Sequence, residues 1–249
     1  MMISILKKII ETLGYKLLRN RKGFDNQWIP GIPNSNRLNL LEFLIKTELF
    51  KGWNGLIQIG ANDGINSDPF REFIIKYNLK SILIEPNIFV FDKLKKNYQE
   101  YPNVVLENSA IIHDEHASSK IPFYELKSKL ENDNTDYSGF STLDEQIIKK
   151  VQFANPNTYI NTLLVNCLSV TSLIEKYKID KLSVLVIDAE GLDIILCKEF
   201  FRNNLFPNLI YIEILHQKQK DIAELISFLI LNDYLIGGNI SDLIAYRKV

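Results

Sequence analysis

The sequence predicts an α/β fold whose centre is a mostly parallel, doubly wound β-sheet. From Gly55 onward, short apolar segments that resemble buried strands alternate with longer segments of helical periodicity. Strands separated by helices pair in parallel through crossover connections, so that helices cover both faces of the sheet. The last two strand-like segments are too close together for a crossover, and they predict an antiparallel hairpin at one edge of the sheet.

The expected elements follow one another in order along the chain. Strand-like segments occupy residues 55–60, 81–86, 103–112, 182–191 and 207–215. Helix-like segments occupy residues 68–78, 89–101, 192–204 and 221–233. The first of these helices is expected to begin at Asp68 and Pro69, since both residue types favour helix N-termini, and Pro86 stops the second strand. The closing hairpin comprises residues 234–240 and 242–248.

The length of 249 residues suits one large α/β domain with an appendage. Residues 1–50 are expected to form an N-terminal helical extension, with a basic amphipathic helix followed by two prolines and a second helix. Residues 51–249 form the main domain. Within it, the polar segment at about 125–162 is too long for a plain connection, so we expect either a functional lid or a partly disordered insertion.

Composition and charge narrow the class of protein. The formal net charge of −1 provides no general attraction for nucleic acid, so no nucleic-acid partner is expected. Cys167 and Cys197 both lie in apolar runs, which predicts buried thiols in a reducing compartment. No apolar run reaches the roughly 18 residues of a membrane span, and the N-terminus lacks the pattern of a secretory signal. A cytoplasmic location is therefore expected.

The basic N-terminal helix leaves two interpretations open. It could make weak contact with an anionic membrane surface, which would place the protein at the inner face of the membrane. Alternatively, it packs on its own domain or on a second subunit, and in the latter case the protein would be a homo-oligomer. We favour the second interpretation, because the excess of positive charge is modest.

The first strand ends in a glycine-rich turn, Gly60-Ala61-Asn62-Asp63-Gly64. Ligands of open parallel sheets bind beyond the carboxyl ends of the strands, and glycines let the backbone approach them closely. The next strand ends in Glu85, where a carboxylate can accept both hydroxyls of a ribose. Together these features predict a nucleoside-containing cofactor. The G-x-G-x-x-G spacing typical of NAD-binding proteins is missing.

Five segments, in the order IQIGANDG, ILIEPN, ENSAI, VLVIDAEGLDIIL and IYIEILH, resemble the FkbM family of S-adenosylmethionine-dependent O-methyltransferases. The resemblance runs from about Gly55 to Arg247. It implies a class I methyltransferase, Rossmann-like fold with a seven-stranded sheet whose final strand is antiparallel. It also implies methyl transfer to a hydroxyl of a sugar, glycan or related metabolite.

The resemblance implies a role for individual residues as well. The methionine end of the cofactor would be lined by Gly60, Ala61, Asn62, Asp63 and Gly64, its ribose held by Glu85, and its adenine flanked by Asn108, Ser109 and Ala110. Many relatives carry an acid where this chain has Gln58. Recognition of the cofactor's amino group is therefore assigned either to the carbonyl of Gln58 or to Asp188.

Methyl transfer to a hydroxyl requires alignment of the reacting atoms and removal of a proton. Asp188 and Glu190 end one strand, while Glu213 and His216 end the next, and adjacent parallel strands lie about 4.8 Å apart. Two catalytic mechanisms are open. The three carboxylates could bind Mg²⁺ or a similar hard ion, or His216 could act as a metal-free base, which is the mechanism we favour.

Contacts with the acceptor are expected from Asp68, and from Tyr137 and Ser141 in the polar segment. The acceptor is expected to be a sugar, a glycan or a small metabolite. Two other functions also stay open: a Rossmann-type nucleotide-sugar reductase, and a methyltransferase-like binding subunit without catalysis.

Overall fold

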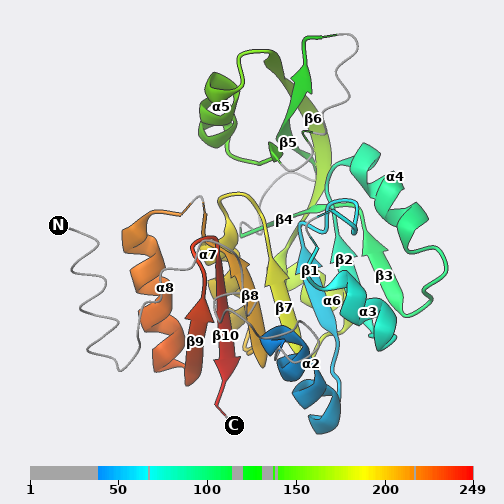
Figure 1. The fold of residues 1–249 in the computed structure, drawn as a ribbon, viewed down its shortest axis with the longest axis vertical. Helices are drawn as coiled ribbons and strands as arrows, with labels where there is room; N and C mark the ends of the chain where they lie inside the picture. The colour runs from blue at the N-terminus through cyan, green and yellow to red at the C-terminus, as the bar shows by residue number, and fades with distance from the viewer. Residues whose placement is uncertain are drawn as a thin grey trace, which may run out of the picture.

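The computed structural model in Figure 1 describes residues 39–66, 68–113, 120–130, 137, 140–215 and 217–248. Most of the predicted N-terminal extension, including its basic helix, lies outside the described residues. The second predicted helix is present as α2 (Leu40–Lys51), which begins where the side chain of Asn39 accepts a hydrogen bond from the backbone N–H of Glu42. Within the described ranges, no helix has the length and apolar character needed to cross a membrane.

The main sheet confirms the predicted fold class. Its seven strands are β1 (Leu56–Ile59), β2 (Ser81–Ile84), β3 (Val104–Glu107), β7 (Val184–Ile187), β8 (Leu209–Glu213), β9 (Tyr234–Gly238) and β10 (Asp242–Arg247). They are arranged in the order β3-β2-β1-β7-β8-β10-β9. The first five strands in this order pair in parallel, while β10 is antiparallel to both β8 and β9, as the predicted edge hairpin requires.

Helices cover both faces of the sheet because successive strand residues point to opposite sides. On β7, Val184 and Val186 belong to one hydrophobic cluster, whereas Leu185 and Ile187 belong to the other. The first cluster packs against α2, α3 (Arg71–Lys76) and α4 (Ile88–Asn97). The second packs against α6 (Val170–Tyr177), α7 (Asp193–Arg202) and α8 (Gln219–Leu231).

There is a second sheet of three strands, and in Figure 1 its strands β5 and β6 stand above the main sheet. It contains β4 (Ala110–Ile112), β5 (Lys120–Ser128) and β6 (Thr158–Ser169), with α5 (Glu145–Ala154) between the last two. The single strand predicted at 103–112 is therefore wrong: it divides into β3 and β4, which belong to different sheets. The break falls at Asn108, whose side-chain amide donates to the carbonyl oxygens of Glu85 and Pro86.

The segment predicted as a lid or a disordered insertion has regular structure in its described part. β5 and β6 form an antiparallel pair over nine residues each, from Lys120 opposite Asn166 to Ser128 opposite Thr158. Helix α5 begins at Asp144, whose carboxylate accepts hydrogen bonds from two backbone N–H groups of its first turn. This unit forms a wall beside the carboxyl ends of the main strands.

Candidate functional site

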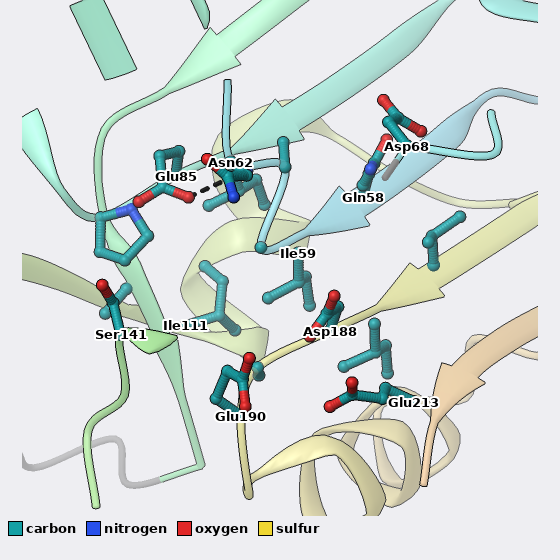
Figure 2. A pocket seen from close by; sticks show the side chains of 18 of the residues that line it. Gln58, Ile59, Asn62, Asp68, Glu85, Ile111, Ser141, Asp188, Glu190 and Glu213 are labelled. Carbon is teal, nitrogen blue, oxygen red and sulfur yellow. Dashed lines mark hydrogen bonds between the residues drawn. The ribbon is translucent and has the colours of Figure 1, made fainter. Parts of the chain in front are cut away.

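The carboxyl ends of β1, β2, β7 and β8 open onto a cavity of about 520 Å³. The strand order reverses between β1 and β7, and this is the place where open α/β sheets bind their ligands. One side of the cavity is lined by Phe123 of β5, and by Ser141 and Leu143 from the segment between β5 and α5. Figure 2 shows the polar side chains that converge on it from several elements.

The glycine turn brings backbone, without a side chain, to the centre of the site. Gly60 has a φ of +79°, and a Cβ there would lie only 1.8 Å from the carbonyl oxygen of Asp188. The backbone N–H groups of Gly60 and Ala61 both donate to the carbonyl oxygen of Ile84, which fastens the turn to the end of β2. Gly60, Ala61 and Asn62 line the cavity, where the resemblance placed them.

Glu85 lies at the end of β2 with its carboxylate inside the cavity lining. Its two oxygens accept hydrogen bonds from the backbone N–H groups of Asn62, at 3.0 Å, and Asn87, at 2.8 Å. Burial raises the pKa of Glu85 to about 7 in spite of these bonds, with a smaller contribution from the negative charge of Asp188. The carboxylate is thus held in one orientation, and each oxygen keeps a lone pair for a ligand hydroxyl.

Three residues that the resemblance placed around the cofactor, Asp63, Gly64 and Asn108, do not line the cavity and instead hold the backbone next to it. Asp63 accepts hydrogen bonds from the backbone N–H groups of Ile65 and Asn66, so its carboxylate holds the turn together. Gly64 faces the side chains of Leu94 and Tyr98, which a Cβ would meet at 2.6 Å and 2.5 Å. Neither of these residues lines the cavity, and the same holds for Asn108 at the break between the two sheets.

The remaining predicted contacts divide in the same way. Ser109 and Ala110 line the cavity, and the hydroxyl of Ser109 donates to a carboxylate oxygen of Glu107 at 2.8 Å. Ser141 also lines the cavity, and its buried hydroxyl has no hydrogen-bond partner within the described ranges. Tyr137, in contrast, is not part of the lining.

Three carboxylates meet at the ends of β7 and β8, as the sequence predicts. One oxygen from each of Asp188, Glu190 and Glu213 can be chosen so that all three lie within 4.8 Å of one another. The reason is the parallel pairing of Ile187 with Ile212, which makes the two residues that follow them neighbours. Asp193 holds the connecting turn, because its carboxylate accepts hydrogen bonds from the backbone N–H groups of Ala189 and Gly191.

The environment of this acid cluster strongly favours protonation. Burial raises the pKa of Glu190 to about 8 and that of Glu213 to about 9, and the negative charge of Asp188 adds to both shifts. The pKa of Asp188 is raised for the same reason, by burial first and then by the charges of Asp193 and Asp242. No lysine, arginine or histidine belongs to the described cavity lining.

Two functional candidates in the lining were missed by sequence reasoning, namely Tyr211 and Asp242. Asp242 is the first residue of β10 and lies opposite Glu213 in the antiparallel pair, which brings a further carboxylate to the cavity. Only the register of the hairpin could have revealed this, and the sequence does not show the register. His216 lies outside the described residues, so its catalytic role stays a prediction.

The comparison with family models agrees with the predicted family. The model of the Methyltransferase FkbM domain matches residues 58–236. Among solved structures, the chain is similar to methyltransferase FkbM from Methylobacillus flagellatus KT, with 13% sequence identity and a TM-score of 0.45 over 78% of this chain and 44% of that one. It is also similar to a methyltransferase from Geobacter sulfurreducens, with 8% identity and a TM-score of 0.41 over 98% and 88% of the two chains.

The chain thus spans less than half the length of the Methylobacillus protein. No curated protein matches it in sequence.

Proposed function

Because the chain belongs to the FkbM methyltransferase family, whose domain model matches residues 58–236, we propose that it transfers a methyl group from S-adenosylmethionine to a hydroxyl of a sugar, glycan or related metabolite. One observation carries this proposal. A single cavity at the strand switch point joins the glycine turn, the buried carboxylate of Glu85 and the acid cluster of Asp188, Glu190 and Glu213.

The cavity suits the proposed cofactor in shape and charge. Its volume of about 520 Å³ lies within the range of roughly 300–1,000 Å³ usual for small-ligand sites. Glu85 would accept the ribose hydroxyls, and Ser109 and Ala110 would lie beside the adenine. The acidic lining favours a ligand with positive charge, and bound S-adenosylmethionine supplies a methyl group activated by its sulfonium.

The acid cluster suits the removal of a proton from the acceptor. In its ionised form, a carboxylate whose pKa is raised is a stronger base than a free carboxylate, so ionised Glu190 or Glu213 can take up the proton as the oxygen is methylated. Carboxylates also accept hydrogen bonds from neighbouring hydroxyls, which would orient a sugar. The described lining has no basic side chain, and this favours a neutral acceptor over a phosphorylated one.

The proposal is tested by incubating the purified protein with S-adenosylmethionine and a panel of acceptors, and by measuring S-adenosylhomocysteine formation. The panel should pair neutral sugars and glycans with their phosphorylated or nucleotide-linked forms. We expect turnover with neutral acceptors and a large loss of turnover in Glu213→Gln, which keeps the size of the side chain but removes its basicity.

Calorimetry separates the alternative functions. Binding of NAD(P) instead of S-adenosylmethionine would indicate a reductase and contradict the proposal. Binding of S-adenosylmethionine without turnover on any acceptor would indicate a binding subunit.

A further inference from the structure

Glu190 has a strained backbone at the edge of the cavity. Its φ of +48° lies in the left-handed region, which few residues other than glycine adopt. The same residue lines the cavity and supplies one of the three carboxylates of the acid cluster. Such strain persists only where surrounding groups hold the backbone in place, and it is concentrated at functional sites. The contacts around Glu190 therefore indicate what keeps its carboxylate in the cluster.

The peptide group that joins Glu190 to Gly191 is held at both ends. Its N–H, on Gly191, donates to Oδ2 of Asp193 at 2.9 Å. Its carbonyl oxygen, on Glu190, accepts a hydrogen bond from Oγ1 of Thr142 at 2.7 Å. Gly191 is also tightly packed, because a Cβ there would lie 2.5 Å from Cδ1 of Ile147 in α5. One bond from α7 and one from the segment before α5 thus fix the orientation of this peptide, and with it the direction of the Glu190 side chain.

Thr142 can hold this peptide because its own polar groups are all engaged. The residue is only 2% exposed. Its backbone N–H and carbonyl oxygen form a pair of hydrogen bonds with the backbone of Tyr124 in β5, both at 2.9 Å. Its hydroxyl accepts a hydrogen bond from the backbone N–H of Asp144 at 3.0 Å, so the single hydroxyl proton is left for the carbonyl oxygen of Glu190. Thr142 is therefore a fixed link between the second sheet and the turn after β7.

We propose, on the basis of the function proposed above, that Thr142 is a positioning residue whose hydrogen bond holds Glu190 with its carboxylate directed at the acceptor hydroxyl. Thr142 itself does not line the cavity, so it acts through Glu190. Without this bond, the peptide is free to rotate toward an ordinary negative φ, which turns the carboxylate away from Asp188 and Glu213. In Figure 2, Glu190 lies between these two acids and Ser141, the residue that precedes Thr142. The segment between β5 and α5 thus contributes to proton removal as well as to the shape of the cavity.

The test measures turnover in Thr142→Val, which keeps the size of the side chain and removes the hydroxyl. With S-adenosylmethionine and an acceptor that the wild-type protein methylates, kcat should fall by about ten- to hundred-fold, because a small displacement of a reacting group is enough for such a loss. Binding of S-adenosylhomocysteine should not change, since Gln58, Asp68 and Glu85, which were predicted to contact the ligands, line other parts of the cavity in Figure 2. Thr142→Ser keeps the hydroxyl and should recover most of kcat.

Two further variants separate positioning from a general loss of stability. Thr158→Val is the matched control, because Thr158 is fully buried and its hydroxyl donates to the carbonyl oxygen of Asn155, at the other end of α5, at 2.6 Å. It should lower the melting temperature as Thr142→Val does and leave kcat unchanged. When Thr142→Val is combined with Glu190→Gln, turnover should be no lower than in Glu190→Gln alone, because both changes remove the same catalytic group.

Full activity of Thr142→Val would overturn the inference, and so would losses that multiply in the double variant. Crystal structures of the wild-type and Thr142→Val proteins decide the point without turnover: Glu190 should leave the left-handed region in the variant, and a carboxylate that stays in the cluster would contradict the inference. If Thr142→Val does not fold, Thr142→Ser and Thr142→Ala give the same comparison, since they differ from each other only in the hydroxyl. If the wild-type protein methylates no acceptor while Glu190 moves in the variant, the proposed function is refuted and the positioning of Glu190 by Thr142 stands.

Discussion

Replacing Gly60 with alanine is expected to damage the site, because the turn after β1 has no room for a side chain. A Cβ at this position would lie 1.8 Å from the carbonyl oxygen of Asp188 and 2.9 Å from its carbonyl carbon. Both are backbone atoms that cannot rotate away. The ends of β1 and β7 would have to separate by roughly 1.5 Å to reach ordinary contact distance, which would move Asp188 out of the acid cluster.

Gly55, just before β1, offers a matched control. Its φ of +104° is as unfavourable for alanine as the +79° of Gly60, but a Cβ there would meet only the carbonyl oxygen of Lys80, at 3.8 Å. Gly55→Ala should therefore cost only the backbone strain, about 1–2 kcal/mol. Gly60→Ala should add an overpacking cost of about 1–3 kcal/mol. The difference corresponds to roughly 2–12 °C in melting temperature for a chain of this size.

Urea unfolding followed by circular dichroism measures both variants, and titration with S-adenosylhomocysteine reports on the site. We expect the larger loss of stability and the loss of binding in Gly60→Ala, with binding preserved in Gly55→Ala. Equal losses of stability in the two variants would show that the close approach of β1 and β7 contributes nothing beyond backbone strain, and would refute the reasoning.

Three further predictions concern pH, metal ions and the second sheet. The free energy of unfolding of the ligand-free protein should fall as the pH rises from about 5 to 8: the raised pKa of Glu85, Glu190 and Glu213 means that the folded state binds more protons than the unfolded state in this window. Glu85 alone, which is 6% exposed and whose pKa is raised from 4.5 to about 7, accounts for about 3 kcal/mol of this change. The urea midpoint should therefore depend less on pH in Glu85→Gln than in the wild-type protein. A free energy of unfolding that rises with pH would contradict these shifts. The metal-free mechanism predicts that methyl transfer survives a chelator; loss of activity in EDTA and its return with Mg²⁺ would assign the acid cluster to a metal ion instead. Glu125→Ala should destabilise the second sheet by about 1.5–3 kcal/mol, because this residue, 3% exposed, accepts hydrogen bonds from the side chains of Asn87 and Asn161; hydrogen exchange in β5 and β6 should increase, whereas Lys127→Ala, at an exposed lysine beside it, should leave exchange unchanged.

The fold and the centre of the site follow from local sequence patterns. Parallel strands of similar length end at one edge of the sheet, so residues that directly follow Ile59, Ile84 and Ile187 are brought together whatever the details of packing. For this reason the sequence alone is enough to assign Gly60, Glu85 and Asp188 to one cavity. The position of a residue directly after a parallel strand is enough to predict that it lies at this edge, because that position depends only on the topology of the sheet.

The second sheet could not be predicted, because its strands lack a clear periodicity. β6 shows no regular alternation of buried and exposed residues, and Leu164 in its middle is 69% exposed. Residues 103–112 carry two apolar stretches around Glu107, Asn108 and Ser109, and nothing in this composition requires the second stretch to join a different sheet. The break depends on hydrogen bonds from the Asn108 side chain to Glu85 and Pro86, which are distant in the sequence. Tertiary contacts, and not local propensity, decide this part of the fold.

Asp242 shows how a functional group can depend entirely on register. In the observed hairpin, Asp242 lies opposite Glu213, and Leu243 opposite Ile212 packs into the hydrophobic core. A shift of one residue would exchange the two faces of β10, exposing Leu243 and burying the carboxylate of Asp242 in the core. The apolar residues of the last strand therefore select the register that brings the carboxylate of Asp242 to the cavity. Burial is the main cause of the raised pKa of Asp188 and Glu213, and the charge of Asp242 adds a smaller contribution, so packing at the sheet edge influences the acidity of the site.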